Sequence, residues 1–351
     1  MLKRGSPLWI GLLALPWVLG GLWIAFGSAP SPPQREVIVY CALDRLYAQP
    51  ILDRFTERTG ITVRAKWDTE ASKTTGLVKA LLTEHERPRC DVFWNNEVSQ
   101  TIRLADAGAL DSYRSPSAVG IPDWARDPKD RWTGFAARAR VLIVNEARVP
   151  KDARPTSVQD LADPRWRGQV GIAKPLFGTT ATHAAVLFAL NGPEPAIAFF
   201  ESLKANRVVI CAGNADVKDR VVAGELAFGW TDTDDAHLAM LAGEKIVVVF
   251  PDQGPEGKGT LLIPNSVAVI QGGPNPVEAR ALVDALLSAE TEEALAAARS
   301  AQIPLRPGLE RPSWIPKDLK ALNVDWQAAG QAFGAARTYL DTRFLAPAEG
   351  K

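Results

Sequence analysis

The chain has 351 residues, of which 46% are hydrophobic, enough for about two domains with a substantial core. Lysine plus arginine number 40, and aspartate plus glutamate also number 40. A chain with balanced charge has no field that recruits a polyanion, so we expect no nucleic-acid partner. The three cysteines are too few and too scattered for a disulfide framework or a zinc site.

The N-terminus has the features of an export sequence. Lys3 and Arg4 precede an uncharged apolar run over residues 7–27. Positive residues stay on the cytoplasmic side, so the remainder of the chain should be extracytoplasmic. The length of the run fits either a long signal peptide or a membrane tether, and both interpretations stay open. Residues 28–34, rich in proline and small residues, are typical of a linker.

From residue 36 onwards, strand patterns alternate with helix patterns. Residues 36–43 alternate in polarity and are rich in β-branched side chains, which predicts a strand. Residues 47–60 place Leu52 and Phe55 on one face of a helix that Gly60 ends. The pattern continues with a strand at 61–67, a helix at 71–86 and a strand at 90–95. Such an order with short connections predicts a doubly wound α/β sheet.

The alternation extends along most of the remaining chain. Further strands are predicted at 140–146, 169–175, 207–213, 226–230, 245–251 and 261–271, and helices at 99–111, 179–192, 194–206 and 217–225. The rest, up to Phe344, is expected to be mostly helical.

Ligands of doubly wound sheets bind beyond the carboxyl ends of the strands. Six connections lie at such positions, and each leads into a predicted helix, so each presents free backbone N–H groups. They are residues 42–45, 68–75, 95–97, 174–180, 213–216 and 231–235.

The last of these connections holds three aspartates, Asp232, Asp234 and Asp235. One carboxylate suffices to cap the next helix and offset its dipole. Neighbouring carboxylates repel one another, and a cation or a donor-rich ligand would relieve that repulsion. Three interpretations stay open: a ligand site, a purely structural acidic cluster, and the metal-binding Asp-x-Asp of sugar-nucleotide transferases, which no nucleotide-binding motif accompanies here.

Two other connections are rich in hydroxyl groups. Residues 68–76 (DTEASKTTG) combine Glu70 with Ser72, Lys73 and Thr74. Hydroxyls, a lysine and free N–H groups suit an oxyanion, although a cap by Ser72 with a solvated Lys73 explains the pattern too. Thr179 lies in a similar helix start. The chain has no P-loop, G-x-S-x-G or G-x-G-x-x-G motif, so NTP use, nucleophilic hydrolysis and dinucleotide binding lack their markers.

Five segments, in this order, carry a family resemblance: VIVYCALDRLYAQPILDRFTERTGITV, DVFWNNEVSQTIRLADAGALD, WTGFAARARVLIVNEARVP, SVQDLADPRWRGQVGIAKP and LLSAETEEALAAARSAQIPLRP. Together they resemble the periplasmic solute-binding proteins of ABC importers, in the branch of ferric-ion-binding proteins. The resemblance extends from about Glu36 to Arg306.

The resemblance implies a type II periplasmic binding fold, in which two α/β lobes are joined by crossing strands near 138–144 and 261–268. Its implied organisation is a signal peptide or anchor plus linker (1–35), lobe 1 (36–137 with 269–300) and lobe 2 (138–268 with 301–345). It further implies a monomeric, non-catalytic periplasmic protein that holds a solute between the lobes, has no organic cofactor and delivers its solute to an inner-membrane ABC permease.

Ferric-binding members use a histidine or another side chain after the first strand, sometimes a glutamate near the second helix, adjacent tyrosines, and often a small oxyanion. In this chain Asp44 takes the histidine position, and the region Thr233–Asp234 replaces the tyrosines. The resemblance therefore implies an all-oxygen ferric site made by Asp44, Glu70, Asp232, Asp234 and Asp235, with an anion bound by Ser72, Lys73, Thr74, Thr179 and Asn214. An organic cation or zwitterion, such as an aminophosphonate, a polyamine or thiamine, fits the same pocket and stays open.

Overall fold

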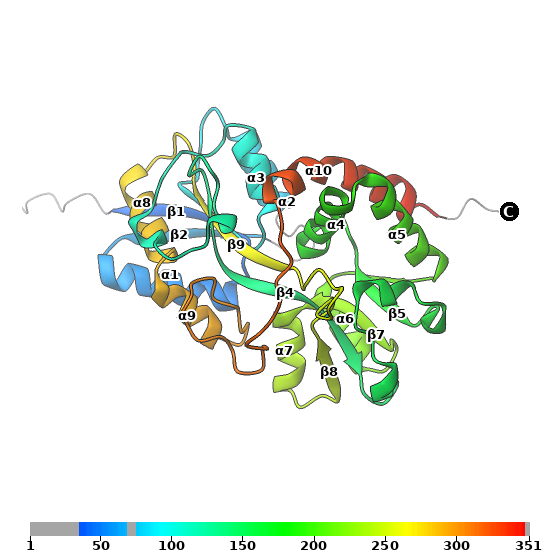
Figure 1. Ribbon diagram of the computed structural model, residues 1–351. Coiled ribbons are helices and arrows are strands. Elements are labelled where there is room, and N and C mark those ends of the chain that lie inside the picture. Colours follow the sequence, from blue (N-terminus) through cyan, green and yellow to red (C-terminus); the bar gives the residue numbers. More distant parts are fainter. Residues whose placement is uncertain (1–34, 69–74, 348–351) are drawn as a thin grey trace, which may run out of the picture. The chain divides into compact units, whose positions relative to one another are not determined.

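The strands form one mixed sheet in the computed structural model, which describes residues 35–68 and 75–347 (Figure 1). Their order is β2-β1-β3-β9-β4-β7-β5-β6, and β8 pairs with β4 off this path. The strands are β1 (Glu36–Cys41), β2 (Thr62–Trp67), β3 (Val92–Asn95), β4 (Thr133–Asn145), β5 (Val170–Ala173), β6 (Val209–Cys211), β7 (Phe228–Asp232), β8 (Ile246–Val249) and β9 (Leu262–Val269).

Helices connect these strands in the order that the sequence predicts. They are α1 (Arg45–Thr59), α2 (Thr75–Thr83), α3 (Ser99–Asp106), α4 (Gly178–Asn191), α5 (Pro193–Ala205), α6 (Asn214–Val222), α7 (Thr233–Leu241), α8 (Pro276–Leu286), α9 (Ala289–Ala297) and α10 (Trp326–Tyr339). The first helix shows how local sequence sets the boundaries. Leu52 and Phe55 face the core, and Gly60 ends the helix with a left-handed φ of 69°.

Strand β4 joins the two halves of the molecule (Figure 1). Its first part, Thr133–Ala139, pairs antiparallel with β9, which itself pairs with β3. Its second part, Arg140–Asn145, pairs antiparallel with β7 and β8. Strands β1, β2 and β3 are parallel in one half, and β5, β6 and β7 are parallel in the other. The fold is therefore two doubly wound α/β lobes joined by the crossing strands β4 and β9, as expected. The exact lobe boundaries remain a prediction.

Beyond residue 297 the expectation of a mostly helical chain is wrong in part. Residues 298–325 contain no helix, and helical structure resumes only with α10. Four prolines in this stretch explain the difference, because proline removes a backbone donor and clashes with the preceding turn. They are Pro304, Pro307, Pro312 and Pro316.

Among the described residues, no helix is long and apolar enough to cross a membrane. The apolar run at 7–27, predicted as a signal peptide or tether, lies outside those residues. Cys41, Cys90 and Cys211 are buried free thiols. Burial raises the pKa of Cys211 to about 11, which keeps this thiol protonated and unreactive at neutral pH.

Candidate ligand-binding site

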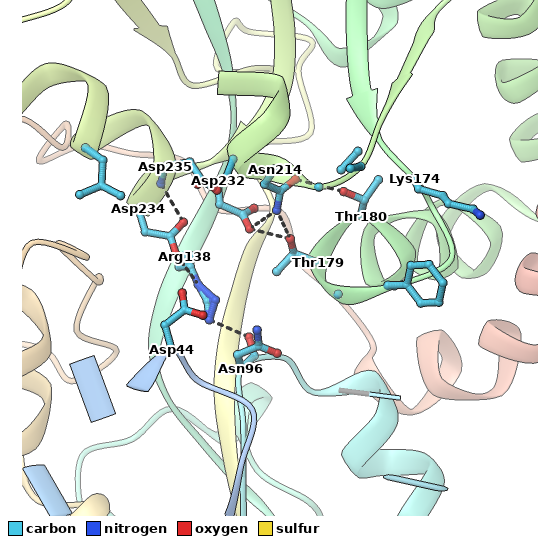
Figure 2. A pocket seen from close by; sticks show the side chains of 17 residues that line it. Asp44, Asn96, Arg138, Lys174, Thr179, Thr180, Asn214, Asp232, Asp234 and Asp235 are labelled. Carbon is cyan, nitrogen blue, oxygen red and sulfur yellow. Dashed lines mark hydrogen bonds and ion pairs between the residues drawn. The ribbon is translucent and has the colours of Figure 1, made fainter. Parts of the chain in front are cut away.

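A cavity of about 320 Å³ lies where the strand ends of both lobes meet (Figure 2). Five of the six connections that the sequence singled out contribute residues to it. Its charged and polar lining residues are Asp44, Asn96, Arg138, Lys174, Thr179, Thr180, Asn214, Asp232, Asp234 and Asp235. The structure thus brings together side chains that are up to 191 positions apart, from Asp44 to Asp235.

The three aspartates after β7 do form a cluster. Each of Asp232, Asp234 and Asp235 offers a carboxylate oxygen within 4.8 Å of the others, and Asp44 faces them from the start of α1 (Figure 2). Asp232 occupies the N-cap position of α7, but its side chain makes no capping hydrogen bond. Asp232 therefore does not make the helix cap that the sequence suggested. Within the first turn of α7, Asp234 Oδ1 accepts a hydrogen bond from the N–H of Asp235 at 3.1 Å.

The reason is that the carboxylate of Asp232 is turned inward to Arg140. Its Oδ1 lies 2.5 Å from Nη1 of Arg140, and both side chains are almost fully buried. Its Oδ2 accepts hydrogen bonds from Thr179 Oγ1 at 2.6 Å and from Asn214 Nδ2 at 2.7 Å. Arg140 also donates to Thr180 at 3.1 Å. These bonds tie the starts of α4, α6 and α7 to strand β4.

Arg138 is buried like Arg140, and it belongs to the cavity wall. Its Nη2 donates to the carbonyl oxygen of Asn96 at 2.9 Å, and its Nε lies 3.4 Å from Oδ2 of Asp234. Burial acts to lower the pKa of Arg138, but the carboxylates of Asp234, Asp232, Asp44 and Asp235 outweigh it and raise this pKa above its usual value. The guanidinium is therefore a permanent positive charge among the four aspartates.

Opposite the acidic cluster, the cavity offers groups that suit an anion. Lys174 is exposed, and its ammonium lies 5.9 Å from the ring centroid of Phe177. Phe177 is the N-cap of α4 and supplies no capping side chain, and neither does Gly213 at the N-cap of α6. Uncapped N–H groups carry partial positive charge at a helix start.

Tyr47 lies close enough to the same carboxylates for their charges to affect the pKa of its phenol. Burial, followed by Asp234, Asp44 and Asp235, raises its pKa to about 12. The phenol is consequently neutral at physiological pH, in contrast to a tyrosinate ligand.

Six of the ten predicted site residues line the cavity: Asp44, Thr179, Asn214, Asp232, Asp234 and Asp235. The other four, Glu70, Ser72, Lys73 and Thr74, lie outside the described residues. Sequence reasoning placed Asn96, Lys174 and Thr180 in the predicted connections without naming them as site residues, and it missed Arg138 and Arg140. The available signal was two charges two positions apart in an otherwise apolar strand, which places both on one face.

Comparison with known proteins shows the family. The model of the bacterial extracellular solute-binding protein family matches residues 96–331. The chain belongs to this family. Its members are extracellular solute-binding proteins, which confirms the solute-binding class and the extracytoplasmic location that the five sequence segments implied.

Individual relatives cover most of the chain. The Iron uptake protein A1 of Synechocystis sp. is 26% identical over 302 residues, 81% of this chain and 81% of that protein. The Fe(3+)-binding periplasmic protein of Serratia marcescens is 24% identical over 325 residues, 90% of this chain and 92% of that protein. The crystal structure of iron-bound HitA from Pseudomonas aeruginosa has a TM-score of 0.78 and 25% identity, and the match covers 87% of this chain and 99% of HitA.

Proposed function

We propose that this protein is the solute receptor of an ABC importer and that it carries ferric iron in the cavity between its lobes to a membrane permease. The observation that carries the proposal is the convergence of Asp232, Asp234 and Asp235 within 4.8 Å, opposite Asp44. Clustered carboxylate oxygens suit a hard, highly charged cation. The names of the relatives in Synechocystis and Serratia support iron as the cargo.

The four aspartates have different roles in this proposal. Asp44 contributes from one lobe, and Asp234 and Asp235 contribute from the other, so that a bound ion favours closure of the lobes about β4 and β9. Asp232 anchors the site, because Oδ2 already accepts two hydrogen bonds and Oδ1 is paired with Arg140. Glu70 remains a predicted further ligand.

The charge of the site argues that iron enters together with an anion. Among the described residues at the cavity, four aspartates face three positive groups, Arg138, Arg140 and Lys174, which leaves one net negative charge. A bare trivalent cation would leave the buried site strongly positive. An oxyanion that bridges between the ion and the uncapped start of α4, near Lys174, restores the balance.

The same arrangement favours one alternative cargo, a zwitterion such as an aminophosphonate. Its ammonium would bind Asp234 and Asp235, and its phosphonate would bind at the start of α4 beside Lys174. Membership in a solute-binding family supports the same role for the Asp-x-Asp with either cargo, namely binding the cargo rather than catalysing a transfer.

Isothermal titration calorimetry with ferric citrate tests the proposal. We expect binding to the wild-type protein and a loss of at least about tenfold in affinity for Asp235→Asn, since one ligand charge is removed. Asp53→Asn on the exposed face of α1 is the matched control and should bind like the wild type. No heat and no thermal stabilisation with ferric citrate, together with binding of 2-aminoethylphosphonate, would establish the alternative.

A further inference from the structure

Arg138 stands at the point where β4 passes from one lobe to the other. It pairs with Ile263 of β9, whereas Arg140, two residues later, pairs with Asp232 of β7. Both side chains leave the same face of the strand. The side chain of Arg138 is only 4% exposed and yet lines the cavity (Figure 2).

The two arginines differ in how each contacts its aspartate. Arg140 donates hydrogen bonds to Asp232, Thr179 and Thr180 and has no exposed side-chain surface. Arg138 donates through Nη2 to the carbonyl oxygen of Asn96 at 2.9 Å and to Oδ1 of Asn265 at 3.4 Å. It faces Asp234 only through Nε, at 3.4 Å, and this Nε makes no hydrogen bond within the described part of the chain. The Nε of Arg140 is also unbonded there, but Nη1 of Arg140 donates to Asp232 at 2.5 Å. The contact of Arg140 with Asp232 is therefore a hydrogen-bonded ion pair, whereas the contact between Arg138 Nε and Asp234 is an ion pair without a hydrogen bond.

We propose that Arg138 is a resident counter-ion that occupies Asp234 while the cavity is empty, and that the cationic group of the cargo binds by displacing it. The proposal rests on the proposed function only in that the cargo brings a positive charge to Asp234. It adds a competition step that a simple set of carboxylate ligands would lack.

The exchange changes both the charge balance of the carboxylates and the contacts of Arg138. Before cargo binds, the positive charge of Arg138 lowers the repulsion among the clustered carboxylates. In the loaded protein, the guanidinium loses its contact with Asp234 but keeps its bond to the carbonyl oxygen of Asn96 at 2.9 Å, on the other lobe. Occupancy thus changes a link between the lobes, and the returning guanidinium assists release of the cargo.

Calorimetry on charge variants tests the exchange. Arg138→Gln removes the competitor, and we expect the affinity for ferric citrate to rise at least about tenfold. Arg138→Lys keeps the charge and should stay within about threefold of the wild type. In an Asp234→Asn background, the change Arg138→Gln should give no gain, because the contested carboxylate is absent.

Several results would overturn the proposal. Weaker binding by Arg138→Gln would assign Arg138 to an anionic group of the cargo, and an unchanged affinity would show that no competition exists. If Arg138 were only structural, Arg138→Gln would lower the melting temperature of the protein without raising its affinity for ferric citrate. Should Arg138→Gln fail to fold, Arg138→Met removes the charge while it fills a similar volume, and the same gain is expected.

Failure of the iron proposal remains distinguishable from failure of the exchange. A wild-type protein that ignores ferric citrate but binds 2-aminoethylphosphonate would refute iron. The exchange would still require that Arg138→Gln or Arg138→Met tighten binding of that ammonium compound, and an unchanged affinity would refute it independently.

Discussion

At the scale of single residues, Asp232 and Asp234 are two positions apart and have different roles. The Asp232→Asn substitution leaves the fully buried Arg140 without its counter-charge, so we expect a loss of about 3–5 kcal/mol in unfolding free energy. The Asp234→Asn substitution changes a side chain that is 15% exposed and should cost about 1 kcal/mol in unfolding free energy, but it should weaken ferric binding at least about tenfold. Urea denaturation and calorimetry measure the two quantities. Equal stability losses in both variants would contradict the division of roles.

Sequence alone predicted the acidic cluster but not the partner of each carboxylate. Three aspartates at a junction between strand and helix are visible in the string TDTDD. Arg140 is 92 positions from Asp232, and only the register between β4 and β7 sets them opposite each other. Burial of a charge pair is a tertiary property. The apolar pattern placed Arg140 at the start of the strand predicted at 140–146, and only the family resemblance placed Arg138 in a crossing strand, so neither arginine was given a further role.

At the scale of secondary-structure elements, helix α10 links the lobes by packing on α4 of one and α3 of the other. Gly330 permits the approach to α3, because a Cβ there would lie 2.5 Å from Cγ2 and 3.1 Å from Cβ of the buried Ile102. We expect Gly330→Ala to lower the unfolding free energy by about 1–3 kcal/mol through overpacking.

Gly334, one turn later on the same helix, is the matched control. It is exposed, and nothing lies within 4 Å of the position that a Cβ would take there. Gly334→Ala should therefore stabilise the protein by about 0.5–1 kcal/mol, since alanine is the better helix former. Denaturant unfolding measures the change in unfolding free energy for both variants. A stabilising Gly330→Ala would contradict the overpacking, because it would show that α10 can move away from α3.

Elements were more predictable than contacts. The strands at 36–43, 61–67 and 90–95 were predicted from alternation, and β1, β2 and β3 lie within one or two residues of them. The irregular stretch 298–325 was missed, because the remainder of the chain was expected to be mostly helical although four prolines in this stretch exclude a helix. The position of α10 across both lobes depends on a glycine contact that no local pattern reveals.

At the scale of the whole molecule, the lobes are also joined beside the cavity by Glu97. This carboxylate follows β3, is 1% exposed and accepts a hydrogen bond from Thr182 Oγ1 of α4 at 2.8 Å. It also accepts from the N–H groups of Ser99 at 2.6 Å and Gln100 at 3.0 Å, which start α3. One buried acid thus holds a helix start in one lobe against a helix of the other.

The pH dependence of stability should report this link between the lobes. Burial raises the pKa of Glu97 above its usual value of 4.5, and the hydrogen bonds from Thr182, Gln100, Asn95 and Ser99 offset only part of the shift. The folded protein therefore binds the Glu97 proton more tightly than the unfolded chain does. The stability that this proton contributes is complete below about pH 4.5 and is lost as the pH rises through the folded pKa. The slope is at most about 1.4 kcal/mol per pH unit.

Unfolding free energies of the wild type and of Glu97→Gln, measured in urea across that pH range, isolate the effect. The advantage of the wild type over the variant should be greatest in acid and should shrink as the pH rises, because glutamine imitates the protonated acid at every pH. Glu57→Gln on the exposed face of α1 is the control for removal of a carboxylate as such. An advantage that grows with pH would mean that the four donors, rather than burial, dominate the Glu97 site, and that the lobes are held together by an ionised carboxylate.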